Sequence, residues 1–136
     1  MRTETAQTPI PTIPSALERC RDSIDAALQE SLAPYSSELY DSLRYHLGWR
    51  DTKGQLTGAH SGKALRPTLW LLACEWAGGK WEDSLASSAA LELVHNFSLI
   101  HDDIQDGDTE RRHRPTLWSV WGRPKAIVAG NAMRCL

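Results

Sequence analysis

The chain lacks several features that would place it in well-defined functional classes. Its 136 residues carry 15 basic and 17 acidic side chains, so it has no basic field that would attract nucleic acid or an anionic membrane. The first 15 residues contain no apolar segment typical of a secretory signal or a membrane span. No strand-like alternation and no internal repeat is found. These absences favour a globular helical protein without a transmembrane segment.

Cysteine is scarce, and its spacing excludes two kinds of site. Cys20, Cys74 and Cys135 are odd in number and far apart, and they lack the short paired spacing that structural zinc or a redox dithiol requires. We interpret them as reduced thiols and expect a cytoplasmic protein. The composition, 41% hydrophobic and 24% charged, fits one soluble domain.

Hydrophobic periodicity predicts an all-α fold. Five segments show apolar residues at helical spacing, and proline or glycine stands where a helix would end or break. The segment 65–77 is apolar on nearly all faces, which predicts a helix buried on most sides. Residues 1–14 are expected to form a disordered arm. The predicted helices span residues 15–32, 36–47, 65–77, 81–106 and 116–133, the last one broken near Gly122.

Four aspartates crowd into seven residues at the end of the long predicted helix. Asp102 and Asp106 are four residues apart, so on a helix their carboxylates lie on one face, about one turn from each other. Like charges this close repel, and the arrangement is costly unless cations such as Mg²⁺ occupy it. The alternative is a solvated acidic helix end. The cluster comprises Asp102, Asp103, Asp106 and Asp108.

Basic residues flank this acidic cluster on both sides. Before the third predicted helix, Lys63 and Arg66 lie three apart, and we expect them on a first helical turn, where the helix N-terminus also attracts phosphate. After the aspartates, the run Arg111-Arg112-His113-Arg114 offers further guanidinium groups. A pair of surface cations is commonplace, so a solvated surface is the alternative interpretation.

His95 stands on the same predicted helix, seven residues before Asp102, and should share its face. A lone buried histidine is more often a satisfied core residue. Here it could donate to an anion that the nearby cations hold.

Taken together, three segments resemble the trans-prenyl (polyprenyl) diphosphate synthases. The match runs from about Tyr45 to Ala132 in the order and spacing of that family, and the aspartate-rich block followed by paired arginines is highly specific. The resemblance implies the isoprenoid synthase helical bundle, of which residues 15–136 would form the N-terminal half. The segments that carry it are residues 62–67, 93–106 and 111–116.

The resemblance also implies a reaction and roles for residues. The family's enzymes are Mg²⁺-dependent prenyltransferases that condense isopentenyl diphosphate with an allylic diphosphate. Asp102 and Asp106 would hold Mg²⁺ on the allylic diphosphate, with Asp103 as an additional candidate, and Arg111 would contact the same diphosphate; Asp102, Asp106 and Arg111 are the catalytic candidates. Isopentenyl diphosphate would be bound by Lys63, Arg66, His95 and Arg112. The substrate-binding candidates together are therefore Lys63, Arg66, His95, Arg111 and Arg112.

Product length in such a site should depend on the helix below the aspartates. Ser98, four residues before Asp102, shares its face and is small, which would leave a deep channel. Phe97 lies further round the helix and could block part of it. We therefore favour a geranylgeranyl-length product over farnesyl.

The sequence departs from the family pattern after Arg114. Family members continue with a second aspartate-rich motif, and nothing in this chain resembles it. Asn131 stands where the family commonly has aspartate. We expect a chain without the C-terminal half of the domain, with uncovered apolar faces that pair in a homodimer or with a complete synthase.

Three other interpretations remain open at this stage. A terpene cyclase of the same architecture would need the aspartates but has no second diphosphate to hold, so residues 62–67 argue against it. A non-catalytic accessory subunit or a nonfunctional fragment would retain the motifs without using them.

Overall fold

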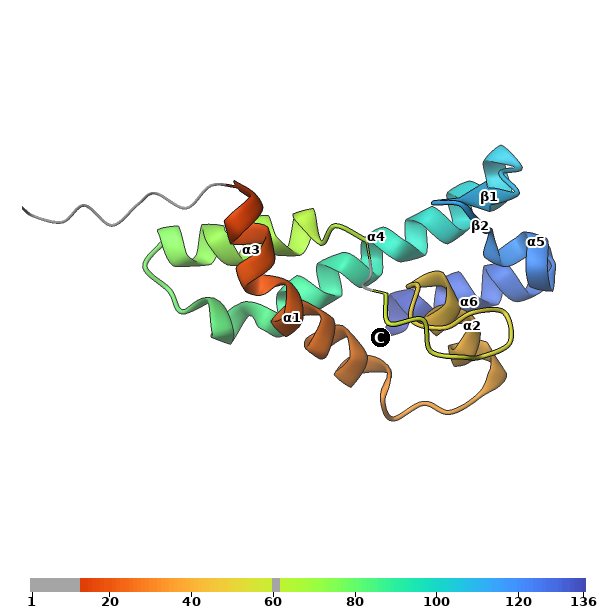
Figure 1. The fold of residues 1–136 in the computed structure, drawn as a ribbon, viewed down its shortest axis with the longest axis horizontal. Helices are drawn as coiled ribbons and strands as arrows, with labels where there is room; N and C mark the ends of the chain where they lie inside the picture. Colours follow the sequence, from red (N-terminus) through yellow and green to blue (C-terminus); the bar gives the residue numbers. More distant parts are fainter. Residues whose placement is uncertain (1–12, 60–61) are drawn as a thin grey trace, which may run out of the picture.

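The structure is a computed structural model that describes residues 13–59 and 62–136, and the described chain is helical apart from one short hairpin (Figure 1). The predicted arm therefore falls mostly outside the described residues, and the first helix already begins at Ile13. The elements are α1 (Ile13–Leu32), α2 (Glu38–His46), α3 (Leu65–Trp76), η1 (Trp81–Ser84), α4 (Leu85–Asp106), β1 (Glu110–Arg111), β2 (Arg114–Pro115), α5 (Leu117–Trp121) and α6 (Arg123–Cys135).

Helix α4 is the central element. Figure 1 shows α1 and α3 beside its N-terminal half and α2, α5 and α6 beside its C-terminal half, and α4 packs against α1, α3 and α6. Apolar side chains at helical spacing form the common core because their burial removes hydrocarbon surface from water. The buried members on these helices include Ile24, Leu28, Leu71, Leu93, Ile100 and Met133.

The end of α4 determines where the acidic cluster lies. Gly107 adopts the left-handed conformation, with φ 73°, and its N–H donates to the carbonyl of Asp103, which closes the helix. Glycine adopts this conformation without the steric cost of a Cβ. Asp102 and Asp106 consequently occupy the last turns of α4, one turn apart, as the sequence predicted.

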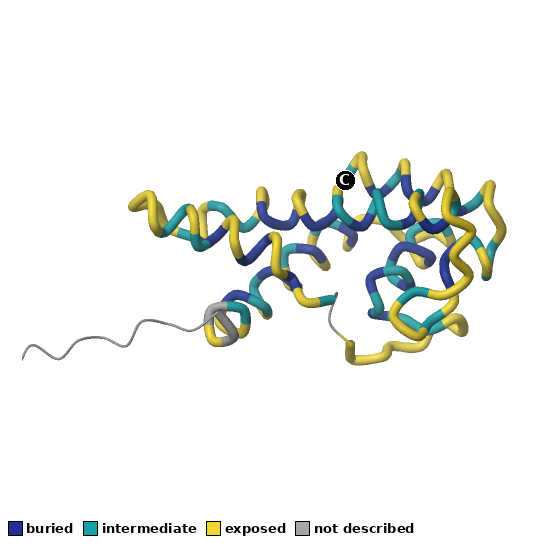
Figure 2. The backbone as a smooth tube through the Cα atoms, turned by 90° about the horizontal axis from the view of Figure 1, so that it is seen from above, coloured by how far each residue is buried: buried dark blue, intermediate teal, exposed yellow. Residues whose placement is uncertain are grey.

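The prediction that α3 is buried on most sides is wrong. Only Pro67, Thr68 and Leu71 of this helix are buried, and Trp76 is 94% exposed. Within the described part of the chain α3 packs against α1, η1 and α4, so its opposite side has no covering helix (Figure 2). The exposed apolar side chains on α3 and on the adjacent side of α4 are Leu65, Leu69, Trp70, Trp76, Leu91 and Val94.

One smaller expectation also needs correction, and two others are confirmed. The segment 81–106 is not one helix, because a 3₁₀ turn, η1, precedes α4. The all-α prediction is confirmed, and the short hairpin of β1 and β2, which pair in antiparallel register, is an addition that the sequence did not signal. The expected break near Gly122 is confirmed, since α5 ends at Trp121 and α6 begins at Arg123. None of the described helices is both long enough and apolar enough to span a membrane.

Candidate functional site

The hairpin that follows α4 is strained at its turn. Arg111 pairs with Arg114, so Arg112 and His113 form the two-residue connection, and both have positive φ, at 53° and 60°. Turns of this kind favour asparagine and glycine, because a Cβ in the left-handed region costs about 1–2 kcal/mol per residue. A strained turn without glycine is a frequent feature of functional sites. In this protein the turn directs Arg111 and Arg114 to different parts of the fold.

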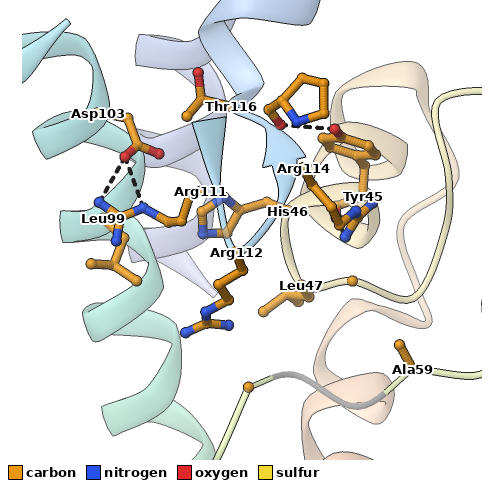
Figure 3. A pocket seen from close by; sticks show the side chains of 13 residues that line it. Tyr45, His46, Leu47, Ala59, Leu99, Asp103, Arg111, Arg112, Arg114 and Thr116 are labelled. Carbon is orange, nitrogen blue, oxygen red and sulfur yellow. Dashed lines mark hydrogen bonds and ion pairs between the residues drawn. The ribbon is translucent and has the colours of Figure 1, made fainter. Parts of the chain in front are cut away.

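Arg111 binds back onto α4. Its Nε and Nη2 lie 2.8 Å and 2.7 Å from Oδ1 of Asp103, whose side chain is almost completely buried (Figure 3). Burial raises the pKa of Asp103, and the hydrogen bond and positive charge of Arg111 oppose that rise. The same hydrogen bond raises the pKa of Arg111. The ion pair thus ties β1 to the last turn of α4 and turns Asp103 away from its two exposed neighbours.

Arg114 binds in the opposite direction, onto α2 and the loop after it. Its guanidinium donates to the carbonyl oxygens of Tyr45, at 3.0 Å, and Arg50, at 2.7 Å. The same group lies 4.2 Å from the centre of the Tyr45 ring, a cation–π contact. Tyr45 in turn donates from its hydroxyl to the carbonyl of Pro115, at 2.8 Å. Arg114 therefore has a structural role at this end of the fold.

Arg112 is the arginine of the run whose guanidinium remains available. Among residues 13–59 and 62–136 it forms no hydrogen bond and no ion pair. Its guanidinium packs against Gly62, so that a Cβ at Gly62 would lie 2.7 Å from Nη1 of Arg112. Gly62 has φ +62°, and its carbonyl accepts a hydrogen bond from Arg21 of α1. A glycine is needed here for both the backbone conformation and the close approach.

Arg66 of α3 contacts His95 of α4. Nη1 of Arg66 lies 3.1 Å from Nε2 of His95. Burial lowers the pKa of His95, and the positive charges of Arg66, Arg112 and Arg111 lower it further, while Asp102 opposes them. One cation of α3 therefore contacts this histidine, and the hairpin arginines act on it through their charge. Such a cluster is suited to an anion with several oxygens.

Lys63 lies before α3 and not on its first turn, which corrects the sequence prediction. The helix begins at Leu65, and Ala64 before it has φ 48°. Lys63 is exposed beside Gly62, three residues from Arg66. Its flexible side chain therefore adds a mobile point charge at the edge of the cluster.

Asp102 and Asp106 lie on a different side of α4 from the buried Asp103. Asp102 and Asp106 are exposed on α4, while Asp103 is buried and bound by Arg111. Among the described residues no group of three or more His, Cys, Asp or Glu side chains could enclose a metal ion. Mg²⁺ commonly uses one or two carboxylates together with water and substrate phosphates. The pair Asp102 and Asp106 fits that use, and the geometry favours it over Asp103.

A cavity of about 220 Å³ lies between the hairpin, the end of α2 and α4 (Figure 3). The imidazole of His46 forms part of its wall, together with Leu99 of α4 and Gly62. The sequence contains no signal that singles out His46, because it stands alone at the end of α2. His46 lines the same cavity as Arg111 and Arg112, and the positive charges of these arginines contribute to lowering its pKa, after burial.

Acid is expected to destabilise the protein through His46. Burial lowers the pKa of His46 to about 3, and the positive charges of Arg112 and Arg111 contribute. Between pH 6.5 and pH 3 the unfolded chain binds a proton that the folded protein does not, so stability is lost as the pH falls through this window. We expect a slope of about 1.4 kcal/mol per pH unit from this residue, measured by urea unfolding. His46→Gln should flatten the slope, and an unchanged slope would contradict the assignment.

The fold and the site define a class of protein, an all-α bundle whose central helix carries exposed carboxylates beside a cluster of cations. The family model described as Polyprenyl synthetase matches residues 54–136. The chain therefore belongs to the polyprenyl synthetase family. The resemblance that the sequence suggested is confirmed.

Two curated relatives come from Mycobacterium tuberculosis. A (2E,6E)-farnesyl diphosphate synthase is 49% identical over 92 residues, which are 68% of this chain and 26% of the relative. A geranylgeranyl diphosphate synthase is 43% identical over 117 residues, 86% of this chain and 33% of the relative. The chain thus spans about a quarter to a third of the length of these proteins.

Solved structures show the same fold. A polyprenyl synthetase from Streptomyces coelicolor is 39% identical, with a TM-score of 0.84 over 91% of this chain and 37% of that protein. A geranylgeranyl pyrophosphate synthetase from Pyrococcus horikoshii is 30% identical, with a TM-score of 0.72 over 90% of this chain and 35% of that protein. The helices described here therefore correspond to part of the isoprenoid synthase helical bundle.

Proposed function

We propose that this chain carries the substrate-binding cations and the first metal-binding aspartates of a trans-prenyl diphosphate synthase, which joins isopentenyl diphosphate to an allylic diphosphate in isoprenoid biosynthesis. The observation that supports this most strongly is the contact of Arg66 with His95 on α4, the helix that also carries the exposed Asp102 and Asp106. Two sites for two diphosphates would then lie side by side on α4.

The cation cluster is the proposed site for isopentenyl diphosphate. Arginine forks and a lysine bind phosphate oxygens directly, whereas carboxylates need a cation between themselves and a phosphate. Arg112 is free of other partners among the described residues, and Gly62 leaves room for its guanidinium. Leu99 offers an apolar wall on the same cavity for the hydrocarbon part. The proposed contacts are Lys63, Arg66, His95 and Arg112.

The exposed carboxylates are the proposed site for the allylic diphosphate. Asp102 and Asp106 would hold Mg²⁺, which when bound neutralises the charge that develops on the departing diphosphate. Arg111, kept close by its bonds to Asp103, would contribute a further positive charge to that diphosphate. The apolar side chains along α4 would keep water from the carbocation.

Turnover of radiolabelled isopentenyl diphosphate tests this proposal. The purified 136-residue chain would be supplied with Mg²⁺ and dimethylallyl, geranyl or farnesyl diphosphate, and the products would be separated by length. Elongated product that disappears in Asp102→Ala is expected if this chain forms a working site. Absence of product together with absence of diphosphate binding would contradict the proposed function.

We also propose that the product is geranylgeranyl-length in preference to farnesyl. The Phe97 ring packs edge-on against His101, with centroids 5.0 Å apart, and Arg134 of α6 lies over it. This supports a place for Phe97 to the side of the path that runs along α4 from Asp102 past Ser98. Ser98→Phe should shorten the product by at least one five-carbon unit on chromatography. A fifteen-carbon product from the unmodified chain would contradict the preference.

A second candidate function is that of an accessory subunit. Its support is the apolar surface formed by α3 and the adjacent side of α4, where Trp70 is 49% and Trp76 94% exposed. Surfaces of this kind commonly bind another protein chain. A homodimer or a complex with a complete synthase should appear on size exclusion, and mixing with such a synthase should change its turnover. A monomer that forms no complex would contradict this candidate.

A further inference from the structure

Helix α6 packs against α4 at a buried glycine. A Cβ added at Gly130 would lie 2.6 Å from Cδ2 of His101 and closer still to its Nε2. Side chains do not tolerate contacts this short, so a larger residue at position 130 must displace the imidazole. Protein interiors are close-packed, and a ring commonly fills the space that a missing side chain leaves. The ring of His101 therefore occupies the space beside Gly130.

A hydrogen bond joins the same imidazole to α6. Nε2 of His101 lies 3.3 Å from the backbone oxygen of Ile127, a long hydrogen bond. Because a carbonyl oxygen can only accept, Nε2 is the nitrogen that carries the hydrogen in this bond. The imidazole is thus held against α6 at two points, by its contact with Gly130 and by its bond to Ile127.

The Phe97 ring lies against the imidazole of His101, one helical turn away on α4. The centroids of the two rings are 5.0 Å apart and their planes are inclined by 77°, the edge-to-face geometry that favours an aromatic pair. The guanidinium carbon of Arg134, on α6, lies 5.8 Å from the centre of the Phe97 ring, within the range of a cation–π contact. The position of the Phe97 ring therefore depends on how α6 packs against α4.

We propose that His101 and Gly130 are positioning residues for product length: they keep the Phe97 ring beside α6. The ring then stays clear of the path past Ser98 that a growing hydrocarbon takes under the proposed function, on which this inference rests. Phe97 and Ser98 are consecutive, so their side chains leave the helix about 100° apart. A change of the χ1 rotamer would swing the Phe97 ring round the helix toward that path.

The first test measures the position of the Phe97 ring without any ligand. The chain contains one phenylalanine, so labelling with ring-¹³C phenylalanine gives NMR signals from Phe97 alone. Gly130→Ala is compared with Asn131→Ala, a change of the same helix at an exposed neighbouring position. We expect the Phe97 ring signals to shift in Gly130→Ala, because the added methyl group displaces the imidazole, and to stay in place in Asn131→Ala. Unshifted signals in a folded Gly130→Ala protein would overturn the proposal.

Product length is the second readout. With isopentenyl diphosphate, dimethylallyl diphosphate and Mg²⁺, Gly130→Ala should give a major product shorter by at least one five-carbon unit than that of the unmodified chain, and Asn131→Ala the same product as the unmodified chain. A purely structural defect would lower turnover and leave the product distribution unchanged, and that result would overturn the role in product length. If the unmodified chain gives no product, the proposed function fails, and the Phe97 signals alone decide whether Gly130 positions this ring.

His101→Ala covers the case in which Gly130→Ala does not fold. This variant removes the imidazole and creates room beside Gly130, so it avoids overpacking. We expect shifted Phe97 signals and a shorter product here as well. Adding Gly130→Ala to His101→Ala should then shift the Phe97 signals no further, because the ring that connects the two positions is gone. Phe97 signals that are the same in His101→Ala and the unmodified chain, or a full second shift in the double variant, would contradict the proposal.

Discussion

Replacing Asp103 by alanine should lower the free energy of unfolding by about 2–3 kcal/mol, whereas the same change at Asp102 should alter it by less than about 0.5 kcal/mol. Asp103 is 1% exposed, accepts a hydrogen bond from Nε of Arg111 and forms an ion pair with its Nη2, so its loss leaves that guanidinium without its partner. The effect is smaller than for a fully buried pair because Arg111 is partly exposed. Asp102 is exposed, and urea unfolding of both variants measures the difference.

Ligand binding should show the opposite pattern, with a larger loss on replacing Asp102 than on replacing Asp103. Asp102→Ala should weaken Mg²⁺-dependent binding of geranyl diphosphate by about 100-fold, because it removes one of two proposed carboxylate ligands. Asp106→Asn serves as the comparison at the other ligand position and should give a similar loss. Asp103→Asn, which retains the size of the side chain, should retain most of the binding. Equal losses of binding at all three positions would show that the two exposed aspartates have no special role.

The second large contrast is expected between two arginines of the hairpin. Arg114→Ala should cost about 3 kcal/mol of stability, because it removes two charge-assisted hydrogen bonds and the cation–π contact with Tyr45. Arg112→Ala should leave stability within about 0.5 kcal/mol, since its guanidinium has no partner among the described residues. Thermal and urea unfolding of the two variants provide the comparison.

For ligand affinity the order should be opposite to the order for stability, with the larger loss in Arg112→Ala. Arg112→Ala should weaken binding of isopentenyl diphosphate by about 10–100-fold, the loss expected for charge-assisted hydrogen bonds. Arg112→Lys keeps the charge but not the fork, and an intermediate loss is expected. If Arg112→Ala unfolded the protein and Arg114→Ala abolished binding without loss of stability, the assignment of the two arginines would be reversed.

Much of the fold follows from local sequence signals. The ends of α1 and α4 are set by apolar periodicity and by a glycine such as Gly107, both visible in the sequence. The exposure of α3 was not predictable in this way. Its apolar residues indicate that the helix belongs to a larger core, but they carry no information about which covering elements this chain contains.

Only part of the candidate site could be predicted from the sequence. Spacing correctly placed Asp102 and Asp106 on the exposed end of one helix, and the same rule separates Asp103 from them. The different partners of Arg111, Arg112 and Arg114 depend on a hairpin with two residues of positive φ, which has no glycine or asparagine to signal it. His46 belongs to the site only through tertiary contacts with α4 and the hairpin.

The central claim is that α4 carries two neighbouring diphosphate sites, one built from cations and one built from carboxylates. Calorimetric titration of two ligands into three proteins tests it most directly. Isopentenyl diphosphate should bind without metal, lose affinity in Arg112→Ala and keep it in Asp102→Ala. Geranyl diphosphate should bind only with Mg²⁺, lose affinity in Asp102→Ala and keep most of it in Arg112→Ala. Binding of neither ligand, or the same loss for both ligands in both variants, would contradict the account.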